Sequence, residues 1–136
     1  MIVKKILSIC LFVVCAITMY AQSRLGYSVS EIRQEFSESK YNLKSNYDKN
    51  NNFYISISTE TSSVVYYFNS NDKCIITFIV PDNQGSLNAY VESYNKQYVI
   101  VSPTQWKMYC SEGIAEIKLV YGDDGGYYFI WNNQKL

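Results

Sequence analysis

Apolar side chains recur at every second position in four runs between residues 41 and 80, and this is the period of a half-buried β-strand. The inward residues of the runs are Tyr41, Leu43 and Tyr47; Phe53, Ile55 and Ile57; Val64, Tyr66 and Phe68; and Cys74, Ile76, Phe78 and Val80. Polar segments at 48–52, 60–62 and 69–72 separate them, and the Asn and Asp residues they contain suit tight turns. Four strands with short turns predict an antiparallel meander with one buried face.

Two segments follow the helical period instead. The first begins at a capping box formed by Ser28 and Glu31 and is expected to run for about ten residues, to an exit at 37–40. The second starts after Pro81, with Asn83 or Ser86 as its N-cap. Its apolar stripe consists of Leu87, Tyr90, Val91 and Tyr94. Both segments therefore predict amphipathic helices that pack on the sheet.

Strand periodicity returns after Tyr98 and predicts three or four further strands. Their inward residues are Trp106, Met108 and Cys110; Ala115, Ile117, Leu119 and Tyr121; and Tyr127, Phe129 and Trp131. The order helix, four strands, helix, three or four strands predicts an α+β fold, with both helices packed on one face of an antiparallel sheet. The two halves, 28–80 and 84–136, are nearly equal in length, which suggests an internal pseudo-repeat.

Residues 1–21 have the pattern of a secretory signal peptide. Lys4 and Lys5 precede an apolar core of about a dozen residues, and the small residue Ala21 stands where a signal peptidase would cut. The apolar stretch is too short to span a bilayer comfortably. We therefore expect export and cleavage, leaving residues 22–136 as a single α+β domain in the periplasm or outside the cell, with no stable membrane anchor.

The composition excludes several kinds of site. The sequence has no histidine, so histidine-activated nucleophiles and histidine-bearing zinc sites are excluded. Without Lys4 and Lys5, ten basic residues face twelve acidic ones, which changes the net charge from 0 to −2. This near-balance gives no electrostatic basis for binding nucleic acid or an anionic membrane.

Two of the four cysteines, Cys10 and Cys15, lie in the signal segment and lack the small preceding residues of a lipidation site. Cys74 and Cys110 would enter a compartment where disulfides persist. A bond between them would stabilise the domain by roughly 3–4 kcal/mol in the chain-entropy model. The sequence leaves this bond and two separate buried thiols equally open.

The acidic residues are better explained by structure than by chemistry. Asp123 and Asp124 stand between glycines, but the ligand spacing of a calcium loop is missing, so a turn is expected there. A glycosidase would need two carboxylates across a cleft, whereas Glu31 is a cap and Glu35 and Glu116 are expected at the surface. We therefore predict no metal ion, no cofactor and no catalytic residue.

The outward strand positions carry the candidate binding residues Tyr54, Tyr67, Tyr109 and Tyr128. The aliphatic residues expected beside them are Val65, Ile75, Ile79 and Ile130. Tyrosine offers a large rigid contact surface with a hydrogen-bonding tip, which suits protein interfaces and sugar rings. The alternatives are that helices or loops cover this face, or that the tyrosines only reflect strand propensity. Trp106 and Trp131 are expected to fill the core.

Several resemblances follow from these patterns. The repeated order of one helix and three or four strands resembles the two-repeat layout of beta-lactamase-inhibitor-protein-like folds and, more loosely, TATA-binding-protein-like folds. The segment G-Y-S-V-S-E-I, Gly26 to Ile32, is similar to the start of the first helix in small outer-membrane-assembly lipoproteins. The signal end at Tyr20-Ala21-Gln22 and the Asn- and Tyr-rich body look like small secreted proteins of Bacteroidota. The inhibitor-like resemblance implies binding of another protein across a concave sheet.

Together these observations predict an exported, non-catalytic binding module that contacts a protein through its aromatic-rich sheet face. The same tyrosines would suit a glycan-binding module, which is the first alternative. A structural component of a cell-envelope assembly is the second alternative. An enzyme is not expected, because the sequence shows no catalytic constellation.

Overall fold

The computed structural model describes residues 23–110 and 113–133, so the predicted signal peptide lies outside the described residues. Two α-helices, a short 3₁₀ helix and eight strands make up this part of the chain. The elements are α2 (Val29–Glu35), η1 (Ser39–Tyr41), β1 (Lys44–Tyr47), β2 (Phe53–Ser58), β3 (Ser62–Phe68), β4 (Cys74–Pro81), α3 (Gln84–Gln97), β5 (Val99–Ser102), β6 (Gln105–Cys110), β7 (Gly113–Tyr121) and β8 (Tyr127–Asn133). This confirms the predicted α+β class and its antiparallel strands.

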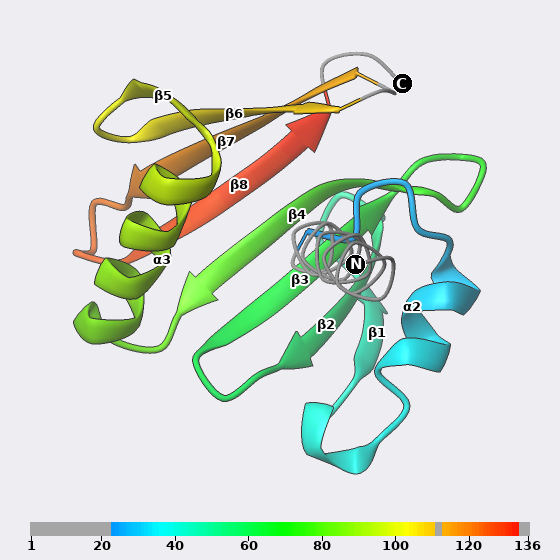
Figure 1. Cartoon of the computed structure of the whole chain (residues 1–136). Coiled ribbons are helices and arrows are strands. Elements are labelled where there is room, and N and C mark those ends of the chain that lie inside the picture. Colours follow the sequence, from blue (N-terminus) through cyan, green and yellow to red (C-terminus); the bar gives the residue numbers. More distant parts are fainter. Residues whose placement is uncertain (1–22, 111–112, 134–136) are drawn as a thin grey trace, which may run out of the picture.

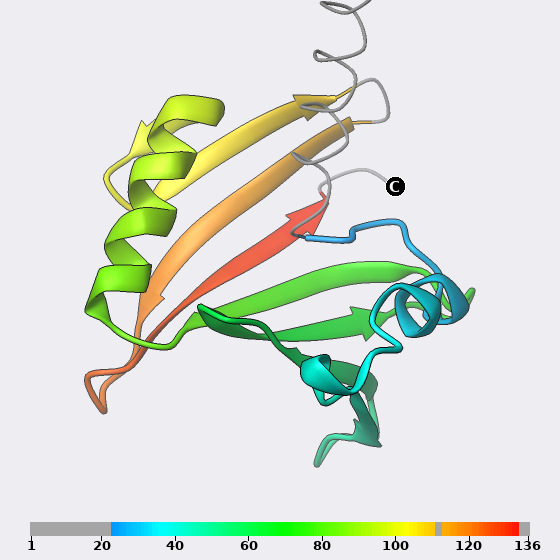
Figure 2. The ribbon, with the colours of Figure 1, turned by 60° about the horizontal axis from the view of Figure 1, so that its bottom comes forward.

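The eight strands form a single antiparallel sheet in the order β1-β2-β3-β4-β8-β7-β6-β5. Each group of four consecutive strands is a meander, and the two meanders join where β4 pairs with β8. The strands β1 and β5 therefore form the two edges of the sheet. Figures 1 and 2 show α2 beside the β1–β4 half and α3 beside the β5–β8 half.

The core is built from alternate sheet positions together with residues of both helices. Its buried apolar residues are Ile32, Phe36, Ile55, Ile57, Val64, Tyr66, Cys74, Ile79, Leu87, Tyr94, Trp106, Ala115, Ile117, Leu119, Phe129 and Trp131. The two tryptophans are fully buried, and each indole N–H has an acceptor on α3. Trp106 Nε1 donates to Asn95 Oδ1 at 2.8 Å, and Trp131 Nε1 donates to Tyr94 Oη at 3.2 Å. Both tryptophans therefore fill the core, as predicted.

The capping box at the start of α2 is confirmed, since the Ser28 and Glu31 side chains each accept a hydrogen bond from the other's backbone N–H. The helix is shorter than expected and ends at Glu35. The predicted strand from residue 41 is also wrong at its start, because Tyr41 belongs to η1 and packs edge-on against Phe36, with 5.0 Å between the ring centroids. Asn42 has a left-handed backbone conformation, with φ of 46°, and ends η1. The strand β1 begins only at Lys44.

The predicted inward face of β4 is wrong by one residue. Thr77 and Ile79 are buried, whereas Ile76 and Phe78 point to the other face, opposite Tyr67 and Val65 of β3. A shift in register between Tyr67 and Phe68 places Cys74 opposite Phe68, so the chain from Cys74 to Ile76 contains one extra residue. Such a bulge reverses the alternation beyond it.

The same correction applies to the far end of the strand and to two predicted core tyrosines. Val80 is exposed rather than inward, and Ile79, expected on the outer face, is in the core. Tyr47 and Tyr121 stand at strand ends, outside the area covered by core residues, and are 59% and 61% exposed. Alternation predicts the face of a residue but not whether that part of the face is covered.

Cys74 and Cys110 are both free thiols in the structure. They lie on β4 and β6, and the strands β8 and β7 stand between these two. Since neighbouring strands are about 4.8 Å apart, their Cα atoms are well beyond the 7 Å limit of a disulfide. The structure thus favours two separate thiols over the bond that the sequence left open.

We expect the two thiols to react at very different rates with maleimide in the folded protein. Burial raises the pKa of Cys74 to about 11, and its side chain is inaccessible, whereas Cys110 is partly exposed. Because the thiolate is the reacting species, Cys74 should react at least about a hundredfold more slowly than an ordinary thiol. Peptide mapping of timed alkylation at pH 8 measures both rates, and urea-unfolded protein is the control. Equal rates in the folded protein would contradict the burial of Cys74.

Candidate binding surfaces

Four aromatic residues form a continuous line across the sheet on the face opposite the core. They are Tyr54 on β2, Tyr67 on β3, Phe78 on β4 and Tyr128 on β8, and we call them the aromatic ladder. These four strands are consecutive in the sheet, so each ring has the next as its neighbour. The ladder thus crosses the junction between the two meanders.

The strand register explains why the rings meet. Tyr54 and Tyr67 are directly opposite one another, with ring centroids 5.7 Å apart. Tyr67 faces Ile76, so Phe78 is its diagonal neighbour, at 5.8 Å and an interplanar angle of 77°. Phe78 in turn reaches diagonally to Tyr128 at 5.7 Å. Diagonal contacts of this kind are within reach of aromatic side chains across antiparallel strands.

Aliphatic side chains surround the ladder on the same face. Val65, Ile76 and Ile130 occupy the cross-strand positions between the rings, where Phe78 stands directly between Val65 and Ile130. Exposed Val80 continues the apolar area along β4. The rings themselves are half-buried against each other and these neighbours. The result is a contiguous aromatic and aliphatic surface rather than a set of isolated tyrosines.

The β1–β2 turn contributes a charged group beside the ladder. Partial burial together with the charge of the Asp48 carboxylate raises the pKa of the Tyr67 phenol. Backbone N–H groups of Asn52 and Asn50 bond the same carboxylate, which lowers the pKa of Asp48. The turn therefore presents a fixed negative charge beside the ladder.

The structure brings together three of the four predicted binding residues. Tyr109 lies on the same face but at the far end of β6, where it pairs with Ile114. One strand separates Tyr109 from Tyr128, and Tyr109 lies six residue pairs further along the strands, about 20 Å away. Phe78, the ring that joins Tyr67 to Tyr128, is absent from the predicted set because the bulge at the start of β4 reversed its assignment.

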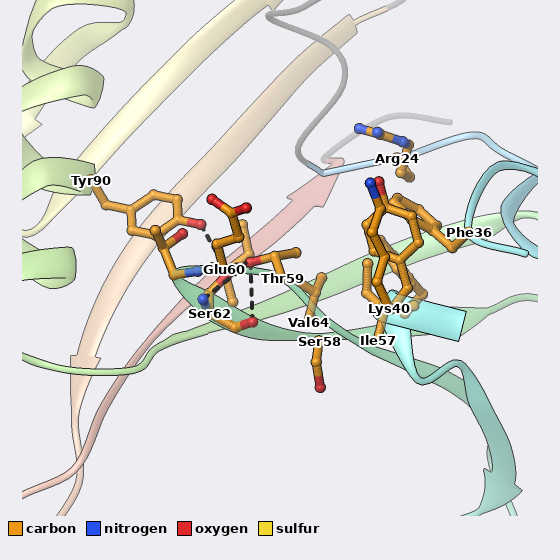
Figure 3. Close-up of a pocket in the computed structure, with 14 residues that line it drawn as sticks. Arg24, Phe36, Lys40, Ile57, Ser58, Thr59, Glu60, Ser62, Val64 and Tyr90 are labelled. Carbon is orange, nitrogen blue, oxygen red and sulfur yellow. Dashed lines mark hydrogen bonds between the residues drawn. The ribbon is translucent and has the colours of Figure 1, made fainter. Parts of the chain in front are cut away.

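A groove lies on the core side of β2–β4, between the α2–η1 segment and Tyr90 of α3 (Figure 3). It is an open groove of about 760 Å³, with a floor of Ile57, Val64, Tyr66 and Ile79. The β2–β3 turn forms one wall, where Ser62 Oγ and Tyr90 Oη share a hydrogen bond of 2.9 Å. An apolar floor with a polar rim is the usual character of a ligand pocket.

Arg24 lines the same groove and is 7% exposed. Its Nε and Nη2 donate to the Glu35 carboxylate at 2.6 and 2.5 Å, and its guanidinium lies 5.2 Å from the Phe36 ring centroid. Within the described part of the chain, Nη1 is buried without a hydrogen-bond partner. The ion pair holds the segment before α2 against the helix, so its first role is structural.

Four of the acidic residues considered above for chemistry are occupied by local contacts. Glu31 caps α2, and Glu35 binds Arg24. Glu116 accepts a hydrogen bond from Gln105 and lies 3.4 Å from the Lys118 ammonium. Asp124 Oδ1 accepts from the backbone N–H of Gly126 at 2.9 Å, as expected of a turn residue. In the described ranges no group of three His, Cys, Asp or Glu side chains could hold a metal ion.

Comparison with known proteins finds no match: no family model, no curated protein and no solved structure resembles this chain at a significant level. Over residues 23–110 and 113–133, none of the helices is long and apolar enough to cross a membrane.

Proposed function

We propose that this protein is an exported, non-catalytic module that binds another protein through the face that carries the aromatic ladder. The observation that carries the proposal is the uninterrupted row of four rings and flanking aliphatic residues across β2, β3, β4 and β8. Contiguous apolar surface rich in aromatic residues is characteristic of the central part of protein interfaces.

The proposal requires that both helices cover the other face of the sheet. The register places Tyr66, Thr77 and Trp131 side by side on one face. Phe36, the C-cap of α2, stacks on Tyr66, with 6.2 Å between the ring centroids. Tyr94 of α3 meets Trp131 edge-on at 5.6 Å. These contacts favour both helices on the core face and leave the ladder face uncovered.

The arrangement of the rings favours a protein over a glycan. A sugar ring stacks on a free, flat aromatic face, whereas the edge of Phe78 meets Tyr67 at an interplanar angle of 77°. Val65, Ile76 and Ile130 fill the spaces between the rings and offer no hydrogen bonds to hydroxyl groups. Aliphatic and aromatic side chains of a protein partner would match this surface better.

The strand order also fits the pseudo-repeat of 28–80 and 84–136 and, through it, the resemblance to the inhibitor-like fold. Each half would supply one helix followed by four strands, and the order of the strands is symmetric about the β4–β8 pair. An approximate two-fold relation of this kind makes one broad sheet from two equal units. The ladder would then lie across the centre of that sheet.

Affinity capture tests the proposal. The purified protein is immobilised and exposed to envelope and host lysates, beside a variant with Tyr54, Tyr67, Phe78 and Tyr128 changed to serine. A matched control carries serine at Tyr47, Tyr109 and Tyr121, which are exposed tyrosines outside the ladder. We expect a protein that wild type and control retain and the ladder variant loses, with circular dichroism showing that all three are folded.

Two other results would contradict the proposal. Equal capture by the ladder variant would place the binding site elsewhere. Binding to members of a polysaccharide panel, lost only in the ladder variant and without a protein partner, would favour the glycan-binding alternative.

A further inference from the structure

The two edges of the sheet differ in character. The edge strand β1 is exposed throughout and presents Lys44, Ser45 and Asn46. The edge strand β5 instead presents the consecutive apolar residues Val99, Ile100 and Val101, which are 52%, 55% and 49% exposed. Figures 1 and 2 show β5 beyond β6, at the outer limit of its half of the sheet.

An edge strand exposes backbone N–H and C=O groups that can pair with another strand. Soluble proteins protect such edges with charged residues, particularly lysine, and β1 has one in Lys44. The sequence Val99-Ile100-Val101-Ser102 contains no charge and consists mainly of β-branched residues, which have the highest strand propensity. The composition of β5 therefore favours pairing with an additional strand.

We propose that β5 is a self-association edge, on which β5 of a second copy pairs in antiparallel orientation about a two-fold axis at Ile100. In this register Ile100 lies opposite Ile100 of the second copy, and Val99 lies opposite its Val101. The next pair would be Tyr98 with Ser102. All these pairs are uncharged, and apolar β-branched pairs stabilise neighbouring strands. The strand is thus complementary to itself.

The length of β5 sets the strength of the association. The strand has four residues, and its register with β6 shifts between Ile100 and Ser102. The stretch of β5 that can pair regularly with a second copy is therefore short. A short seam predicts a weak dimer whose population depends on protein concentration. A two-fold axis perpendicular to the sheet keeps both ladder faces on the same side, so the dimer would present two ladders together; this consequence alone rests on the proposed function.

Sedimentation equilibrium of the purified protein between about 10 µM and about 1 mM tests self-association without reference to any partner. Wild type should change from monomer to dimer over this range. Ile100→Lys places two like charges opposite each other at the axis and should raise the dimer dissociation constant at least about tenfold. Ser45→Lys adds the same charge to the other edge and should leave association unchanged.

A charge-reversal experiment separates loss of pairing from loss of folding. Ile100→Glu should also be monomeric alone, and an equimolar mixture with Ile100→Lys should restore a dimer that contains one copy of each. A wild-type protein that remains monomeric up to about 1 mM would overturn the proposal, and so would a dimer unaffected by Ile100→Lys. Neither result would contradict the proposed binding through the ladder face, which the capture experiment tests separately.

Discussion

Replacement of Tyr94 by alanine should lower the free energy of unfolding by about 4 kcal/mol, within the range for large-to-small changes in a packed core. Tyr94 is fully buried in the last turn of α3. Its ring contacts five others, with centroid distances of 5.0 to 5.9 Å: Tyr90, Tyr98, Trp106, Phe129 and Trp131. Removing this ring would leave a cavity between α3 and the β5–β8 half of the sheet.

Tyr94→Phe separates the hydroxyl group from the ring. The ring contacts would remain, but the buried Trp131 indole N–H would lose the oxygen to which it donates. Leaving that donor unsatisfied should cost about 1–3 kcal/mol. Urea unfolding followed by tryptophan fluorescence measures both variants, and an unchanged m-value supports comparison of the two free energies. Equal losses in Tyr94→Ala and Tyr94→Phe would contradict the packing role of the ring.

Much of this fold could be predicted from the sequence, because strand and helix periods are local properties. The alternation around Ile55, Ile57, Val64 and Tyr66 specifies the buried face of β2 and β3, and the structure confirms it. The Ser28–Glu31 capping box likewise depends only on residues within one turn. Contacts that arise from neighbouring residues can be predicted without knowledge of the tertiary structure.

The β4 assignment failed because one long-range feature changes the phase of a local pattern. Cys74, Ile76 and Phe78 alternate like an inward face, but the bulge opposite Phe68 inserts a residue before Ile76. Polar Thr77 then enters the core, where its hydroxyl donates to the Ser23 carbonyl oxygen. The polar residue Thr77 among apolar neighbours was the only signal in the sequence. It suggests that Thr77 faces solvent, unless its buried hydrogen-bond partner is known.

The grouping of the candidate site residues required the strand order. The sequence predicts that Tyr54, Tyr67, Tyr109 and Tyr128 share a face, and cross-strand register assigns them to one face. It cannot predict that β8 rather than β5 pairs with β4, and this pairing brings Tyr128 to the ladder. The same order separates Cys74 from Cys110. Non-local pairings are therefore what the sequence leaves undetermined.

Phe78→Thr should weaken binding of the captured partner by at least about thirtyfold, equivalent to about 2 kcal/mol or more. Phe78 contacts both Tyr67 and Tyr128, so it links the ladder rings of the first meander to the ring of the second. Residues near the centre of an apolar interface commonly contribute most of its binding energy. Threonine also has a high strand propensity, so the free energy of unfolding should fall by only about 1 kcal/mol.

Tyr109→Thr is the matched control, since Tyr109 lies on the same face and is 61% exposed. Its distance from the ladder predicts a change in affinity of less than about twofold. Titration calorimetry with the captured partner measures the dissociation constants of both variants. If Phe78 contributes strongly and Tyr109 does not, binding follows the contiguous ring system across the β4–β8 junction. If Tyr109→Thr weakens binding as much as Phe78→Thr, the ladder is not the centre of the interface, because general tyrosine exposure on this face would then explain the affinity.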